Sequence, residues 1–212
     1  MPFVPAIFRA LASDPRALEA AWLQARTIYD DARATESAKR LVAAAAPPEL
    51  TYRPSAQVRG ALAPFRSELP LLLLIVTSLG LSLDGLLELR PTPEPSLPEP
   101  GPVPETPVAE YPGEHPLYEA IRAVYGTQHV PVMFRALAAQ DLLGETWAGI
   151  GPYLDSPEGR GHTTRVRTAA QEEARRFPES AFFRVESARA TLEQFKIALP
   201  QNLVFVTAAS AP

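Results

Sequence analysis

The chain has 212 residues, of which 46% are hydrophobic and 21% charged, and this composition is typical of a globular protein long enough to bury a core. Its formal net charge of −4 and its scattered Lys and Arg residues argue against nucleic-acid binding, which needs a concentrated basic surface. The chain has no cysteine, which excludes disulfides, thiol catalysis and Cys-ligated zinc.

The first twelve residues contain one basic side chain, Arg9, and no long apolar stretch. This pattern does not fit a secretory signal peptide. We therefore expect a cytoplasmic protein.

A nine-residue segment occurs twice, as VPAIFRALA at 4–12 and as VPVMFRALA at 130–138, with seven identical positions. A second pair of segments, 59–79 and 189–209, shares eight of 21 positions. Self-similarity over such distances indicates that one structural unit has been duplicated.

The two tryptophans, Trp22 and Trp147, occupy corresponding places between these segments. We therefore expect a first helical repeat over residues 1–90 and a second over 117–212. The joint, residues 91–116, contains ten prolines in 26 residues and favours an extended spacer.

In chain order, the first copy predicts a short helix at FRALA and then a longer helix that opens with Asp14 as N-cap and Pro15 at its first position. Apolar residues then recur at three- and four-residue steps, the spacing of one helix face: Leu18, Trp22, Ala25, Tyr29 and Ala32. β-branched alternation is scarce, so the sequence predicts an all-α protein.

The leucine-rich run 69–83 is 15 residues long, shorter than the roughly 20 that a membrane-spanning helix needs. Its partner in the second copy starts at Leu199, continues PQNLVFVT and does not resemble a membrane span. We expect two buried helices, each with its proline (Pro70, Pro200) in the first turn, and no membrane insertion.

After the spacer, residues 117–125 predict a helix that has no counterpart in the first copy. The helix that carries Trp147 is expected to end early, because Gly149, Gly151 and Pro152 follow it closely. Gly159 and Gly161 extend this glycine pattern, which is more typical of a turn region than of a phosphate-binding loop.

An approach helix ending in AVYG, then VPxxFRALA, then a Trp-bearing helix, duplicated within one chain, resembles the group I 2-haloacid dehalogenases. The resemblance covers both copies. It implies an α-helical pseudo-dimer of two repeats related to the AhpD-like helical proteins, with an apolar cleft between them. It also implies cofactor-free chemistry, in which an aspartate activates a water that displaces halide from C2 of a small 2-haloacid.

In that family pattern the aspartate immediately precedes the aromatic-Arg-Ala-Leu stretch of the second repeat. Met133 occupies that position in this chain, and Ile7 occupies the equivalent position of the first copy. Neither side chain can accept a proton. Other carboxylates are available, but none matches the family position: Asp30, Asp141, Glu145 and Asp155.

Several other residues are candidates for a pocket between the repeats. Asn202 places an amide in an apolar helix where the first copy has Leu72, and a buried amide needs a partner. The remaining candidates occur as pairs, and each pair also has a structural explanation. Trp22 and Trp147 can pack in the core, and Thr77 and Thr207 can bond the carbonyl one turn back. Arg9 and Arg135 can pair with an acid or with a helix C-terminus.

Two functions remain open. The first is hydrolysis of a carbon–halogen bond in a small 2-haloacid, and the second is a non-catalytic small-ligand-binding or assembly role on the same fold. An AhpD-type peroxidase is excluded by the absence of cysteine. The three histidines, His115, His129 and His162, lack metal-ligand spacing, so we expect no metal or other cofactor; a small organic acid is the expected ligand, and self-association is possible.

Overall fold

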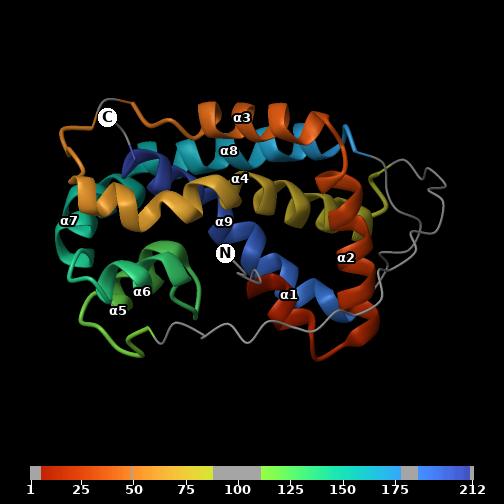
Figure 1. The fold of residues 1–212 in the computed structure, drawn as a ribbon, viewed down its shortest axis with the longest axis horizontal. Helices are drawn as coiled ribbons and strands as arrows, with labels where there is room; N and C mark the ends of the chain where they lie inside the picture. The colour runs from red at the N-terminus through yellow and green to blue at the C-terminus, as the bar shows by residue number, and fades with distance from the viewer. Residues whose placement is uncertain (1–5, 49, 88–110, 178–185, 211–212) are drawn as a thin grey trace.

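The computed structural model describes residues 6–48, 50–87, 111–177 and 186–210, and its secondary structure there is entirely helical, which confirms the predicted all-α class (Figure 1). Val4, Pro5 and residues 91–110 of the proline-rich joint lie outside the described residues. The elements are α1 (Ala6–Leu11), α2 (Pro15–Tyr29), α3 (Arg33–Ala44), α4 (Ala56–Leu83), α5 (Tyr118–Tyr125), α6 (Val132–Ala138), α7 (Leu143–Asp155), α8 (Pro157–Ala174), the 3₁₀ turn η1 (Glu186–Ala188) and α9 (Arg189–Ala208).

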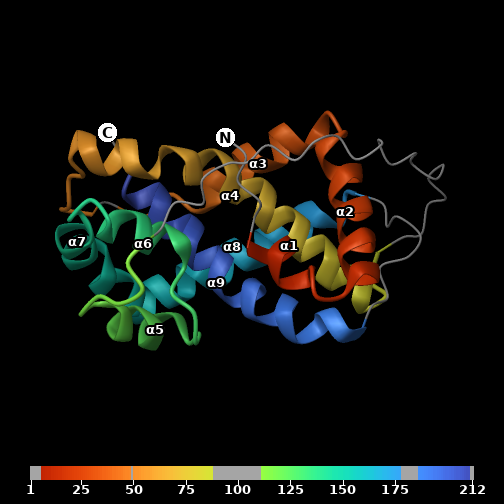
Figure 2. The same ribbon diagram turned by 60° about the horizontal axis from the view of Figure 1, so that its bottom comes forward.

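Helices α4 and α9 cross at the centre of the molecule and form its most extensive helix–helix contact (Figures 1 and 2). Helices α3 and α8 lie side by side against α4 on one face. Helices α1 and α2 pack at one end of the central pair, and α5, α6 and α7 pack at the other.

The central helices run antiparallel. Arg189 at the start of α9 donates to Asp84 just after α4, with Nη1 and Oδ1 2.8 Å apart. Further along, Gly80 of α4 lies against the side chain of Lys196. The short helices cross over: α1 packs against α9, and α6 packs against α4.

Helix starts follow the local chemistry of the chain. The Asp14 carboxylate accepts from the backbone N–H groups of Arg16 and Ala17 at the start of α2, as predicted. Ser156 caps α8 in the same way by accepting from the Gly159 N–H at 3.0 Å. The predicted helix at 117–125 is present as α5.

The prediction that Pro70 and Pro200 occupy first turns is wrong. Helix α4 begins at Ala56 and α9 at Arg189, so both prolines lie inside their helices. The upstream turns continue the same apolar face, with Leu62 fully buried and Leu192 1% exposed. Burial of that face stabilises the helix enough to outweigh the hydrogen bond that a proline removes.

The prediction that the Trp147 helix ends early is also wrong. Helix α7 continues through Gly149, Gly151 and Pro152 to Asp155. The two glycines are explained by close packing: a Cβ at Gly149 would overlap the ring of Tyr52, and one at Gly151 would come within 2.7 Å of the Trp147 ring. Gly159 and Gly161 likewise lie within helix α8.

The length argument against membrane insertion does not hold, because α4 has 28 residues. Among the described residues it is the one helix long and apolar enough to cross a bilayer, and 61% of its most apolar window is buried inside the protein. Every residue from Leu72 to Ser82 is buried, as the prediction of a core helix requires.

Candidate functional site

The two FRALA helices present matching aromatic contacts. The rings of Phe8 and Trp22 meet edge to face with centroids 6.0 Å apart, and those of Phe134 and Trp147 do so at 5.6 Å. Phe134 also contacts Phe205 of α9 at 4.8 Å. These edge-to-face pairs fix each short helix against the helix that follows it.

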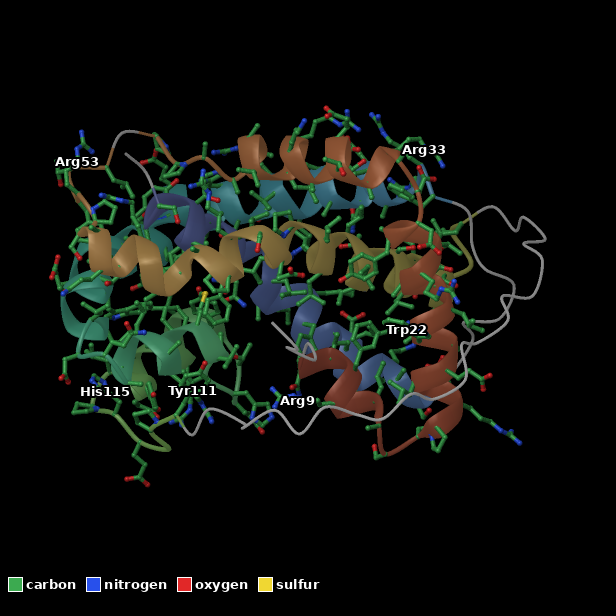
Figure 3. All side chains as sticks on the ribbon, viewed as in Figure 1. Arg9, Trp22, Arg33, Arg53, Tyr111 and His115 are labelled. Carbon is green, nitrogen blue, oxygen red and sulfur yellow. The ribbon has the colours of Figure 1, made fainter. Side chains whose placement is uncertain are left out.

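The tryptophans differ in exposure although they correspond in sequence. Trp147 is 8% exposed, whereas Trp22 is 42% exposed. Helix α7 packs against α5 and α8 in addition to α6 and α9, while α2 packs chiefly against α1 and α4. Trp147 is therefore a core residue of the second half, whereas Trp22 is partly open to solvent. Figure 3 shows Trp22 reaching from α2 toward α1, whose Phe8 it contacts.

Met133 and Ile7, which stand where the family pattern has its aspartate, are both core residues. Met133 is 1% exposed and Ile7 is fully buried. The four other candidate carboxylates, Asp30, Asp141, Glu145 and Asp155, are all exposed. Two of them face basic side chains: Asp30 lies 3.6 Å from Arg26, and Asp155 lies 3.1 Å from Arg160.

Eight buried side-chain atoms in the described part of the chain have no hydrogen-bond partner, and four of them belong to residues of α5, α6 and α9, helices that the Tyr125–Phe134 and Phe134–Phe205 ring contacts connect. We call these residues the polar cluster: Tyr125, Arg135, Gln201 and Asn202. Asn202 is 7% exposed and its Oδ1 accepts no hydrogen bond; Gln201 donates from Nε2 to the Val124 carbonyl at 3.3 Å, but its Oε1 also accepts none. Unpaired buried amides are costly, so this place favours a bound polar molecule.

The other two members of the polar cluster are a phenol and a guanidinium. Burial raises the pKa of Tyr125 well above its ordinary value of 10.0, so its hydroxyl stays protonated and can donate. Its ring stacks edge to face on Phe134 with centroids 5.4 Å apart. The Nε of Arg135 is buried without a partner, and its charge partly offsets the burial that raises the pKa of Tyr118.

The paired arginines lie at helix ends, and the paired threonines lie inside the central helices. Arg9 and Arg135 stand in the last turns of α1 and α6, where a cation is favourable beside the helix C-terminus. Neither forms an ion pair within the described part of the chain. Thr77 is buried and Thr207 half-buried, and neither hydroxyl makes the expected bond to the carbonyl one turn back, whereas Thr146 makes that bond to Leu142 at 2.7 Å.

One buried histidine connects three helices. Nε2 of His162 lies 2.8 Å from the Ala44 carbonyl at the end of α3, and Nδ1 lies 2.8 Å from the Tyr153 hydroxyl of α7. Because a carbonyl can only accept, Nε2 is the donor and Nδ1 accepts from the tyrosine. This arrangement is structural, and no group of three or more metal-ligating side chains occurs among the described residues.

A buried carboxylate that the sequence did not point to is Glu173 of α8, which is 6% exposed. Ser37 donates to its Oε2 at 2.7 Å, and Arg40 donates to both of its oxygens at 2.8 and 2.9 Å. The Arg40 hydrogen bonds hold the pKa of Glu173 below its ordinary value of 4.5. With its oxygens occupied, this carboxylate joins α3 to α8 and is not a free base.

Four of the sequence candidates lie on the packed helices α6, α7 and α9, where Met133, Trp147 and Asn202 are buried and Arg135 is half-buried. Sequence reasoning missed Gln201 and Tyr125. The first had a signal, since it precedes Asn202 in an apolar helix. Tyr125 had none, because a tyrosine at an apolar helix position is typical of ordinary packing.

No family model, no curated protein and no solved structure matches this chain.

Proposed function

We propose that this chain is a non-catalytic protein that binds a small organic acid in the core of its second half. The observation that carries the proposal is the make-up of the polar cluster: two amides, a protonated phenol and a guanidinium, with no carboxylate among them. Such groups can hydrogen-bond a carboxylate or hydroxyl of a ligand. They contain no base that could activate water for displacement of halide.

The burial of Met133 and Ile7 supports the non-catalytic alternative over hydrolysis. A carboxylate at either place would need a charged or hydrogen-bonding partner in an apolar core. The four exposed candidate carboxylates are surrounded by water. Without burial in an apolar pocket their basicity is not increased, so they remain weak bases.

We also propose that the fold is a duplicated helical pseudo-dimer, as the family resemblance implies. Reciprocal packing supports this: α1 rests on α9 as α6 rests on α4, and the corresponding pairs α4 with α9 and α3 with α8 contact each other. Two contacts set the antiparallel register of α4 and α9, namely Asp84 with Arg189 and Gly80 with Lys196. If this register continues along the helices, Leu72 lies opposite the region of Asn202. Asn202 is the residue that corresponds to Leu72 in the second repeat. An approximate two-fold axis between α4 and α9 accounts for all of these relations.

The test combines a binding assay with an activity assay. Both enantiomers of lactate and of 2-chloropropionate are added to the purified protein while its Tm and the chloride concentration are measured. We expect at least one acid to raise the Tm of the wild type, because a ligand that binds only the folded state stabilises it. We expect no chloride above the buffer level.

The matched variant is Asn202→Leu, which installs the residue of the first copy. It should fold at least as well as the wild type, because it removes an unpaired buried amide. Its Tm should no longer respond to the acids. Chloride release by the wild type would restore the dehalogenase hypothesis, and a wild-type Tm unmoved by every acid would contradict ligand binding.

A second candidate function is self-association through α2. Trp22 and Tyr29 are 42% and 40% exposed, and they lie two turns apart on one side of that helix. Exposed aromatic side chains of this size are typical of protein interfaces. Light scattering at rising concentration should show a dimer for the wild type and a monomer for Trp22→Gln; a wild type that stays monomeric would refute this candidate.

A further inference from the structure

An open hollow of about 560 Å³ lies where α3 begins beside the end of α8. Of the described residues that line it, three of five are arginines: Ala32, Arg33, Glu36, Arg40 and Arg176. We call it the arginine hollow. Figure 3 places Arg33 at this end of α3, across the molecule from His115 below α5.

Arg40 is fixed in the hollow by a buried carboxylate. Its Nε and Nη2 donate to Glu173 Oε1 and Oε2 at 2.8 and 2.9 Å, a two-pronged contact that sets the plane of the guanidinium. Ser37, which is fully buried, holds the same carboxylate at 2.7 Å. Nη1 of Arg40 donates no hydrogen bond within the described residues and remains available.

Arg33 is anchored in the same manner, whereas Arg176 makes a single, longer ion-pair contact. Arg33 donates from Nε and Nη2 to Asp31, with the shortest contact at 2.6 Å. Arg176 places its Nε 3.4 Å from Glu173 Oε2. In both side chains the outer nitrogens, Nη1 of Arg33 and both Nη atoms of Arg176, have no hydrogen-bond partner in the part of the chain that the structure describes.

The hollow carries a local positive excess in a chain of net charge −4. Among the described lining residues the one acid is Glu36, which is already paired with Lys39 at 2.6 Å. Counted over the described lining residues and their ion-pair partners, four cations stand against three carboxylates: Arg33, Lys39, Arg40 and Arg176 against Asp31, Glu36 and Glu173. Helix α3 also begins here, and its N-cap residue Ala32 supplies no side-chain cap, so the helix start adds a favourable potential for an anion.

We propose that the arginine hollow binds the phosphoryl group of a small phosphorylated molecule. Two anchored guanidinium groups and a third at an ion-pair distance, all with free outer N–H donors around one open space, suit a tetrahedral oxyanion that accepts hydrogen bonds from several directions. A planar carboxylate offers fewer such acceptors. The site is separate from the polar cluster and does not depend on the function proposed for it.

The test is titration calorimetry with inorganic phosphate at pH 7 and low ionic strength, with the full chain. We expect saturable binding that weakens as salt is added, because the ligand and the arginines are partly exposed charges. Arg176→Ala should weaken phosphate binding by about tenfold, since it removes one charge-assisted donor group. This arginine is 52% exposed, so the variant should keep its helical circular dichroism spectrum.

The matched control is Arg175→Ala, which removes the same charge one residue away but not from the lining of the hollow. It should change phosphate affinity far less than Arg176→Ala. A wild type without saturable phosphate binding, an equal loss in both variants, or acetate binding as tightly as phosphate would each overturn the proposal.

Discussion

Two glycines two positions apart in α8 should respond in opposite ways to alanine. A Cβ on Gly159 would overlap the backbone carbonyl of Tyr153, lie 2.8 Å from its carbonyl carbon and lie 3.0 Å from the Cα of Leu154. That carbonyl oxygen is already held by the Ser156 hydroxyl at 2.7 Å, so it cannot move aside. A Cβ on Gly161 would meet only the end of Arg165, at 3.8 Å.

The expected magnitudes follow from these contacts. At Gly161 alanine gains helix propensity of about 1 kcal/mol, which for a chain of this size raises the Tm by about 2–4 °C. At Gly159 the same gain is outweighed by overlap with backbone that cannot relax. Overpacking typically costs about 1–3 kcal/mol of stability. Because this contact is with rigid backbone, we expect its cost to be at or above the upper end of that range. We expect a net loss of about 2 kcal/mol and a Tm about 4–8 °C lower.

The assay is thermal unfolding of wild type, Gly159→Ala and Gly161→Ala, followed by circular dichroism at the helix band. The two variants have identical composition changes in one helix, so each is the control of the other. Equal Tm changes of the same sign, or a Gly159→Ala protein as stable as the wild type, would show that the α7–α8 junction is not packed as described.

Three further predictions concern burial, charge and capping. Acrylamide should quench Trp22 strongly and Trp147 weakly, since they are 42% and 8% exposed; equal quenching in the two single-tryptophan variants would contradict this difference. The pKa of Glu173 is lowered mainly by hydrogen bonds from Arg40, so its stabilising effect is complete above about pH 4.5 and is lost as the pH falls through the folded-state pKa. The Tm gap between wild type and Glu173→Gln should therefore be widest at neutral pH and narrow below about pH 4.5; a gap independent of pH would refute the assignment. Ser156→Ala should cost about 1 kcal/mol by removing the α8 cap, seen as a lower urea midpoint with an unchanged m value; an unchanged midpoint would mean that the cap contributes nothing.

Local signals predicted the helices well. Asp14 with Pro15 marked the start of α2, and apolar spacing located α5, because caps and helix faces depend on residues close together in the chain. The same local rules misplaced the starts of α4 and α9 and the end of α7. In each case a proline or glycine is tolerated inside a helix because distant side chains pack against it.

The candidate site was only partly predictable, for a related reason. Asn202 stood out because a polar residue broke an apolar pattern that its repeat partner kept. The contact of Glu173 with Ser37 joins residues 136 positions apart, and no local pattern signals such a pair. Equivalence between the repeats also predicted similar burial for Trp22 and Trp147. It could not reveal that α5 and α8 pack against α7, the helix of Trp147, and not against α2, the helix of Trp22.

The central helix of each half packs against the short helix of the other half, α9 against α1 and α4 against α6. This arrangement affects the order in which the chain can fold. The leucines of α4 leave the ribosome 106 positions before α9, the helix that covers them, begins. Until then the face of α4 that α9 covers lacks its native partner, although α2 and α3 already pack on other faces of α4, and the non-local contacts between α4 and α9 make the final closure slow. Production of this protein in cells should accordingly depend on chaperones that shield the first half while the second is still being translated.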